Sequence, residues 1–303
     1  MNGGTHMQLG TLIPQTDIGG PPDAVREFAL AAEAAGYDYL EAADHVLGVN
    51  VASRPGWVDR NTSADWFHDP FVLFGFLTPI TKLGFSTGVL ILAQRQAVLV
   101  AKQAACLEVL SGGRFRLGVG VGWNEVEFVG LNEDFHNRGR RSEEQVEVMR
   151  ALWANEHVDF RGRWHRIEDA GINPRPASGH VPLWFGGHHD NTLRRIARLG
   201  DGWMMLALPP GPPAIEAFDT LRRYAEQEKR DPAKIGIEIW TSTAQGEEAD
   251  WRREFQFWKT AGVSHVTLAS THGRGVHKRI PGRTMAEHLH AIKRYREVIA
   301  DLI

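Results

Sequence analysis

Short apolar runs alternate with helical segments along almost the whole chain. A short apolar run bounded by turn residues is typical of a buried strand, whereas longer segments with helix start and stop signals predict helices. The pattern predicts eight strands, at residues 9–14, 37–43, 83–92, 115–121, 181–185, 203–206, 235–240 and 263–269. It predicts eight helices between and after them, at residues 23–35, 70–79, 97–110, 139–154, 191–199, 213–227, 247–260 and 284–302.

The order of these segments predicts the fold. Strict strand-then-helix alternation favours a parallel sheet, and eight units within 303 residues match the size of a (β/α)8 barrel. Gly36, Gly200 and Gly262 each end a predicted helix just before a polar turn and a strand, where a left-handed glycine is favourable. An open doubly wound sheet is the alternative. We expect one α/β domain over residues 8–303, a (β/α)8 TIM barrel, with residues 1–7 outside it.

Four connections are too long to be simple turns. Residues 45–69, 122–137 and 270–283 follow strands, so they open on the C-terminal face of the barrel, where barrel active sites lie. Residues 155–180 instead follow a helix and contain two short strand-like runs, Val158–Arg161 and Trp164–Ile167, around Gly162, which predicts a β-hairpin arm. We expect this arm to serve packing or a homodimer contact.

Composition narrows the class of protein. Hydrophobic residues make up 43% and charged residues 23% of the chain, as in an ordinary globular protein. The formal net charge of −3 argues against a general nucleic-acid binder. The single cysteine, Cys106, excludes a disulfide framework or a multi-cysteine metal cluster. With no membrane-length apolar window and no secretory signal pattern, we expect a cytoplasmic protein that acts on a small-molecule substrate.

Two ionisable residues end the second predicted strand. Asp44 and His45 stand where a barrel strand opens into the mouth. His45 can exchange a proton near neutral pH, and Asp44 can orient it or form a hydrogen bond with a polar ligand. A structural histidine is the alternative interpretation.

The segment 117–123 places glycines within and just after the fourth strand. It superficially resembles a dinucleotide-binding fingerprint, but no helix opens directly after it. Gly120 and Gly122 instead fit a strand that leaves room for a flat ring. Glu125 and Glu127 follow, and one of them is a candidate general acid, with solvated loop glutamates as the alternative.

Glycine also marks two other strands. Gly88, followed by Val89, lies inside the third strand, where a glycine indicates either close backbone approach to a ligand or simple packing. Gly186, Gly187 and His188 follow the fifth strand and open a helix, whose free N–H groups can bind an anion. A tight turn is the alternative there. We expect no metal, because the histidines in this turn lack a third ligand at a recognisable spacing.

The last long connection is basic. Arg274, Lys278, Arg279 and Arg283 lie within residues 271–283 without an acidic neighbour in that segment. On a chain of negative net charge, such a local positive field can guide a multiply charged anion. A solvated loop is the alternative interpretation.

Together these motifs resemble the luciferase-like monooxygenase superfamily, and within it the branch that uses the deazaflavin coenzyme F420. Their order and spacing over residues 8–203 carry the resemblance. The motifs are Ala43-Asp44-His45, Thr87-Gly88-Val89-Leu90, the run from Val109 to Arg114 with Gly118 to Trp123, Arg138-Gly139-Arg140-Arg141, Leu183 to Gly187, and Ala197 to Trp203.

The resemblance implies a cofactor ring across the barrel mouth. It implies a non-prolyl cis peptide at Gly88-Val89 behind the ring, the cofactor phosphate near Gly186-Gly187, and His45 near the reactive ring. One departure matters. A dehydrogenase branch of the family has a glutamate where this chain has Trp123, so that branch's reaction and sugar-phosphate substrate are not carried over.

These observations predict a coenzyme F420-dependent oxidoreductase that transfers a hydride to or from a small organic substrate. The predicted catalytic residues are His45, for the accompanying proton, and Glu125. The alternatives are a monooxygenase that uses reduced FMN and O2, and a non-catalytic flavin-binding protein. Aromatic residues in the mouth segments favour an apolar substrate pocket; they are Trp57, Trp66, Phe67, Trp123 and Phe128. The predicted cofactor-binding residues are Asp44, His45, Gly88, Val89, Gly120, Gly122, Gly186, Gly187 and His188.

Overall fold

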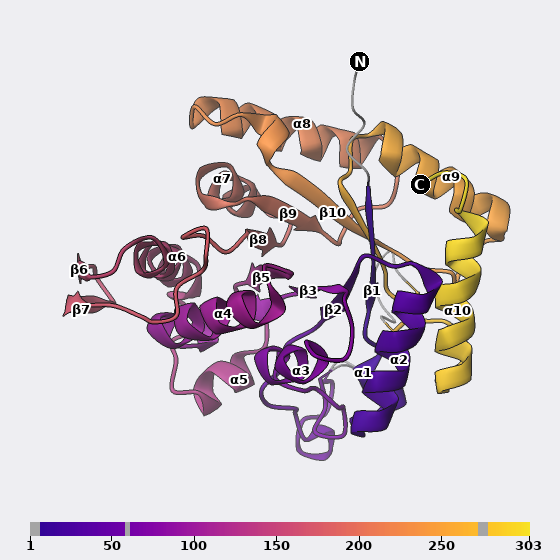
Figure 1. Cartoon of the computed structure of the whole chain (residues 1–303), viewed down its shortest axis with the longest axis horizontal. Coiled ribbons are helices and arrows are strands. Elements are labelled where there is room, and N and C mark those ends of the chain that lie inside the picture. Colours follow the sequence, from indigo (N-terminus) through magenta and orange to yellow (C-terminus); the bar gives the residue numbers. More distant parts are fainter. Residues whose placement is uncertain (1–6, 58–60, 272–277) are drawn as a thin grey trace.

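Parallel strands close into a barrel in the computed structural model, which describes residues 7–57, 61–271 and 278–303 (Figure 1). Strand β1 (Gln8–Leu12) pairs with β2 (Tyr39–Ala42) on one side and with β11 (His265–Leu268) on the other, parallel in both cases. Around the ring from β2 follow β3 (Gly84–Thr87), β5 (Phe115–Gly120), β8 (Leu183–Gly186), β9 (Gly202–Met205) and β10 (Gly236–Thr241), which returns to β11. The predicted (β/α)8 barrel is confirmed.

The third predicted strand is divided. Its first part is β3, its second part is the short strand β4 (Leu90–Ile91), and the two are separated by Gly88 and Val89. The peptide bond between these two residues is cis, as the resemblance implies. The Gly88 N–H donates a hydrogen bond to the carbonyl of Ala42, at 2.8 Å, which ties this break to the end of β2.

Helices cover the outside of the barrel, and the core fills the layer between. Their bounds are α2 (Pro22–Ala35), α3 (Pro70–Leu77), α4 (Ala97–Ser111), α6 (Arg138–Ala154), α7 (Asp190–Leu199), α8 (Pro212–Gln227), α9 (Glu248–Thr260) and α10 (Met285–Val298). Large side chains such as Phe28, Trp153 and Trp203 are fully buried there. The last helix, α10, packs beside α2 and so closes the outer ring (Figure 1). Two shorter helices, α1 (Gln15–Ile18) and α5 (Glu125–Gly130), follow strand ends.

Two of the three glycines predicted to end helices in the left-handed conformation adopt it. Gly36 and Gly262 have φ values of 84° and 82°, the left-handed conformation that glycine adopts without strain. Gly200 has a φ of −89°, so the prediction of a left-handed cap there is wrong. The reason for glycine at this position is space, because a Cβ would lie 3.0 Å from Ile196 Cγ2.

The hairpin arm is present, with a longer turn than predicted. Strand β6 (Val158–Arg161) pairs antiparallel with β7 (Arg166–Ala170), at the edge of the molecule in Figure 1. The second strand starts two residues late because Glu144 accepts hydrogen bonds from the N–H groups of residues 163–165, each at 2.8 Å. A dimer contact through this arm stays a prediction.

Two further observations concern the chain as a whole. Residues 1–6 lie outside the described residues, and Met7, which the sequence placed outside the domain, is buried in the core with 6% of its surface exposed. Among the described helices, none is long and apolar enough to cross a membrane.

Candidate functional site

The C-terminal ends of β2 and β5 bring a histidine and a carboxylate together. His45 Nδ1 lies 3.0 Å from Glu127 Oε2. The other oxygen of Glu127 accepts hydrogen bonds from the N–H groups of Val46, at 2.7 Å, and Leu47, at 3.2 Å. One carboxylate therefore fixes both the imidazole ring and the backbone that follows it.

A short helix presents Glu127 to His45. The segment 122–137, predicted as a loop, contains α5, whose N-cap Asn124 accepts a hydrogen bond from the Val126 N–H at 3.1 Å. Glu127, on the third residue of this helix, is buried, with 1% of its surface exposed. Glu125, on the first residue, is exposed and forms no hydrogen bond or ion pair within the described part of the chain. The catalytic role of Glu125 stays a prediction, and the carboxylate on His45 belongs to Glu127.

The electrostatics of the pair fix the histidine tautomer. Burial would raise the pKa of Glu127, but the hydrogen bond and charge of His45 and the two backbone N–H donors together lower it. An ionised carboxylate only accepts hydrogen bonds, so His45 Nδ1 carries the proton. Nε2 forms no hydrogen bond within the described residues and is left to exchange a proton with a ligand.

Aromatic rings border His45. Phe67 lies edge-on to the imidazole with 4.8 Å between ring centres, and Trp123 lies at 6.0 Å. Trp57 packs against Trp123 at 5.7 Å. Phe128 does not belong to this wall, because it is fully buried in a small cluster beneath it, and its predicted place in the pocket is wrong. The surroundings of His45 are therefore largely apolar.

Both carboxylate oxygens of Asp44 accept hydrogen bonds from protein groups at the mouth. Its Oδ1 accepts a hydrogen bond from Arg95, at 2.7 Å, and its Oδ2 accepts one from the Ile91 N–H, at 3.1 Å. Arg95 also binds Asp69, the N-cap of α3, at 2.9 Å. Burial raises the pKa of Asp44 even though Arg95 opposes this change. Both oxygens already have protein donors, and the predicted contact of Asp44 with a cofactor stays a prediction.

Glycines surround the side chain of Val89 at the mouth. A Cβ on Gly120 would lie 2.6 Å from one methyl group of Val89, and a Cβ on Gly186 would lie 2.9 Å from the other. Neither position accepts a side chain, so the side chain of Val89 lies directly on the backbone of β5 and β8. Val89 and Gly186 are partly exposed, while Gly120 is buried, and we call this the bare surface. Gly122 lies outside this surface, since a Cβ there would meet Ile91 and Phe128. A flat ring fits this surface because neither Gly120 nor Gly186 has a side chain that would project from it.

The turn before α7 offers unpaired donors. Gly187 has a φ of 114°, and its carbonyl accepts a hydrogen bond from the Trp203 indole at 2.6 Å. Within the described residues, the N–H groups of Gly187, His188 and His189 donate no hydrogen bond. Three free N–H groups at the start of a ten-residue helix fit an anionic group such as a phosphate. The described residues include no group of three side chains placed to hold a metal ion.

The basic segment near the C-terminus is partly neutralised. Arg274 lies outside the described residues. Arg279 is bound to Asp17, whose other oxygen lies 3.2 Å from Nε2 of His288. Lys278 and Arg283 are exposed. The guiding field predicted for this segment is therefore weaker than its composition indicates, since a buried carboxylate from α1 offsets one arginine.

A buried charge cluster lies inside the barrel, and no pattern in the sequence indicated it. Arg116 on β5 forms an ion pair with Glu238 on β10 at 2.6 Å. These two strands are not neighbours in the sheet, so the ion pair crosses the barrel interior. Glu41 accepts a hydrogen bond from the Trp240 indole at 2.7 Å. Burial raises the pKa of Glu41 well above its ordinary value, and the charge of Glu238 raises it further. A Cβ on Gly88 would lie 2.1 Å from Glu41, so the cluster lies directly behind the cis peptide.

Comparison with known proteins places the chain in a family. A family model described as luciferase-like monooxygenase matches residues 5–298. An uncharacterised protein of Mycobacterium bovis is 38% identical over 184 residues, which cover 58% of this chain and 62% of that protein. An F420-dependent glucose-6-phosphate dehydrogenase of Amycolatopsis mediterranei is 30% identical over 188 residues, covering 61% of this chain and 53% of that enzyme.

Solved structures share the fold over the full length. An F420-dependent secondary alcohol dehydrogenase in complex with an F420-acetone adduct has a TM-score of 0.77 at 20% identity, and covers 98% of this chain and 99% of its own. Monooxygenase RslO1 from Streptomyces bottropensis has a TM-score of 0.74 at 17% identity, with the same coverage. At these identities the likeness establishes the common barrel alone.

Proposed function

Because the chain belongs to the luciferase-like monooxygenase family, we propose that it is an oxidoreductase that binds coenzyme F420 across the barrel mouth and transfers a hydride to or from a small organic substrate. The observation that carries this proposal is the hydrogen-bonded pair of the half-buried His45 and the buried Glu127 at the mouth. Hydride transfer at an alcohol or carbonyl carbon requires a proton to move as well, and this pair is built to move one.

The residues at the mouth fit the cofactor. The bare surface around Val89, between Gly120 and Gly186, would support the flat ring. The free N–H groups at the start of α7 would bind the phosphate. When bound, the deazaflavin supplies the hydride-accepting carbon at position 5 of its ring.

His45 would handle the proton. In the oxidising direction, Nε2 of His45 would accept the hydroxyl proton of an alcohol whose carbon gives up a hydride, so that a carbonyl forms. Glu127 stabilises the imidazolium that results and keeps Nδ1 protonated throughout. In the reducing direction the same nitrogen returns the proton to the carbonyl oxygen. Phe67 and Trp123, beside the imidazole, favour a substrate with an apolar body.

Reconstitution with each cofactor tests the proposal. Purified protein is titrated with F420 and, separately, with FMN, and binding is followed by the absorption and fluorescence of the bound pigment. Turnover is then measured over a panel of alcohols and carbonyl compounds, with His45→Ala as the comparison. We expect turnover with F420 that falls by roughly 10²- to 10⁴-fold in the variant while F420 affinity changes little.

Two results would overturn this assignment. Turnover with reduced FMN and O2, and none with F420, would make the protein a monooxygenase. Tight binding of a flavin with no turnover over the whole panel would favour a non-catalytic binding protein.

A further inference from the structure

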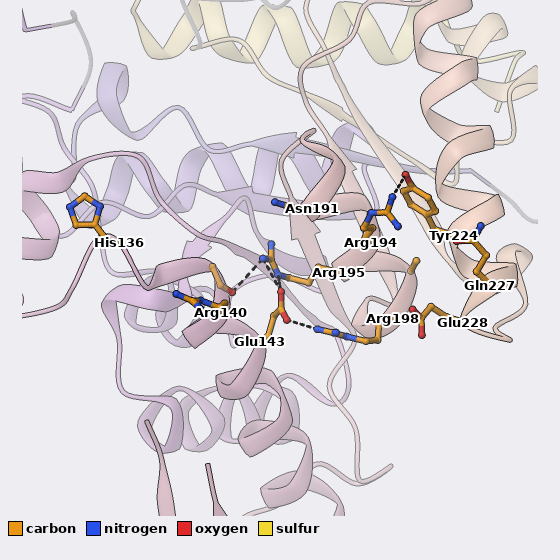
Figure 2. Close-up of a pocket in the computed structure, with 12 residues that line it drawn as sticks. His136, Arg140, Glu143, Asn191, Arg194, Arg195, Arg198, Tyr224, Gln227 and Glu228 are labelled. Carbon is orange, nitrogen blue, oxygen red and sulfur yellow. Dashed lines mark hydrogen bonds and ion pairs between the residues drawn. The ribbon is translucent and has the colours of Figure 1, made fainter. Parts of the chain in front are cut away.

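A second pocket lies on the outer face of the barrel, away from the mouth residues described above. It has a volume of about 520 Å³ and lies among α6, α7 and α8 (Figure 2). Four arginines line it, and we call it the arginine groove; they are Arg140 from α6 and Arg194, Arg195 and Arg198 from α7. No residue predicted to bind the cofactor or to act in catalysis lines this pocket.

The groove is positive on a chain that is negative overall. Two acidic residues, Glu143 and Glu228, line it against the four arginines, although the formal net charge of the protein is −3. Glu143 alone accepts hydrogen bonds from two of them, Arg195 at 3.0 Å and Arg198 (Figure 2). Asp190 also binds Arg194, so three carboxylates face the four guanidinium groups and one positive charge is left in excess.

The guanidinium groups are held in place before any ligand arrives. Arg195 is buried, with 8% of its surface exposed, and it also donates to the carbonyl of Gly139 at 3.3 Å. Arg194 donates to the hydroxyl of Tyr224, at 2.9 Å, and lies over its ring at 4.2 Å. Asp190 holds Arg194 from the other side at 2.8 Å. Fixed arginines lose less conformational entropy when they bind an anion than free ones do.

Arg140 differs from Arg138 and Arg141, the other arginines of the motif at residues 138–141, which are both bound to protein groups. Arg138 donates to the carbonyls of Gly122 and Phe135, and Arg141 binds Glu133. Arg140 is exposed and forms no hydrogen bond or ion pair with any described residue. It stands on the first turn of α6, and the first turn of α7 opens into the same pocket through Asn191. An unpaired guanidinium on the first turn of α6 is suited to bind phosphate groups.

We propose that the arginine groove binds a small molecule that carries two or more phosphate groups, at a site separate from the barrel mouth. Arg140 binds the ligand directly, and so does Arg198, whose guanidinium Glu143 holds in place. This proposal does not depend on the identity of the cofactor, because it rests on residues outside the mouth.

Calorimetric titration with pyrophosphate at low salt tests the site. We expect one site per chain, weakened roughly tenfold by Arg140→Ala and further in the double variant with Arg198→Ala, since each change removes charge-assisted hydrogen bonds to the ligand. Added salt should weaken binding. Arg161→Ala removes an exposed arginine from the hairpin arm and serves as the matched control, with unchanged affinity expected.

Binding at the turn before α7, whose donors are backbone N–H groups, would persist in Arg140→Ala, so a loss of affinity in that variant assigns the ligand to the groove. Because Arg140 has no partner to lose, Arg140→Ala should unfold at the same temperature as the parent, which separates lost binding from lost folding. Pyrophosphate affinity that is equal in the parent and in Arg140→Ala would overturn the proposal. Equal affinity for citrate, lost in the same variants, would overturn the assignment to phosphate.

Discussion

At the scale of single residues, spacing decides which of two similar side chains meets His45. Glu125 and Glu127 are two positions apart, and a loop gives no reason to prefer either. The helix supplies the reason, because Asn124 caps it and Glu127 is its third residue, turned back toward the end of β2. The signal was in the sequence: Asn followed three residues later by Glu is a helix-start pattern. Trp123 completes the site, since it borders His45 where a related branch has its glutamate.

Replacing Glu127 with Gln tests the pair as a unit. The glutamine carbonyl can still accept from Val46 and Leu47, but its NH₂ group would face His45 Nδ1 and favour the tautomer with the proton on Nε2. We expect turnover to fall at least about tenfold in the direction that needs a base, with little change in cofactor affinity.

A control variant and a double variant separate a role of Glu127 in catalysis from a role in folding. Glu125→Gln changes the exposed neighbour and should leave turnover unchanged. The double variant His45→Ala with Glu127→Gln should be no slower than His45→Ala alone, because residues that act together are not additive. Additive losses would show that Glu127 supports the fold rather than His45.

At the scale of elements, the mouth is held together by contacts between strand ends rather than by the strands themselves. Asp44 after β2 joins the N–H of Ile91 in β4 and, through Arg95, the N-cap of α3. The sequence predicted that Asp44 lies at the mouth, but its partners come from residues 47 and 51 positions away. No local pattern reveals such pairs, since they exist only after the barrel closes.

Asp44→Asn tests whether the contacts of Asp44 with Arg95 and Ile91 stabilise the fold. The change removes the carboxylate charge opposite Arg95, which keeps its ion pair with Asp69, so the loss is that of a hydrogen bond between charged groups, about 1.5–3 kcal/mol. We expect the free energy of unfolding in urea to fall by about that amount. Asp23→Asn breaks an exposed pair with Arg26 and should change it by no more than about 1 kcal/mol. Equal small effects of both changes would mean that Asp44 is free to serve a ligand.

At the scale of the whole molecule, the barrel was predictable because alternation repeats eight times and errors in single boundaries do not alter the order. The break at Gly88-Val89 was expected from the resemblance, not from the strand pattern. The interior charge cluster was not predictable. Glu41, Arg116 and Glu238 lie within apolar runs, where single charges look like outward-facing positions, and only closure brings them face to face. Their pairing reflects the inward direction of alternate strand residues.

This cluster makes the stability of the barrel depend on pH in a defined direction. In the unfolded chain the carboxyl of Glu41 loses its proton near pH 4.3, whereas burial and the neighbouring Glu238 hold its pKa well above that in the folded protein. Between these two values the folded state binds more protons than the unfolded state. The contribution of Glu41 to stability is therefore complete below the unfolded value and is lost as the pH rises toward the folded value.

Glu41→Gln isolates this contribution. Glutamine resembles the protonated carboxyl, can still accept from the Trp240 indole, and does not titrate. Other buried groups around it, Arg116, Tyr39, Glu238 and His265, are common to both proteins. The free energy of unfolding in urea, measured from pH 5 to pH 8, should therefore fall more steeply for the parent than for the variant, by up to about 1.4 kcal/mol per pH unit. The free energy of unfolding of Glu125→Gln should depend on pH as steeply as that of the parent. Parallel curves for the parent and Glu41→Gln would show that Glu41 loses its proton at the same pH in the folded and unfolded protein.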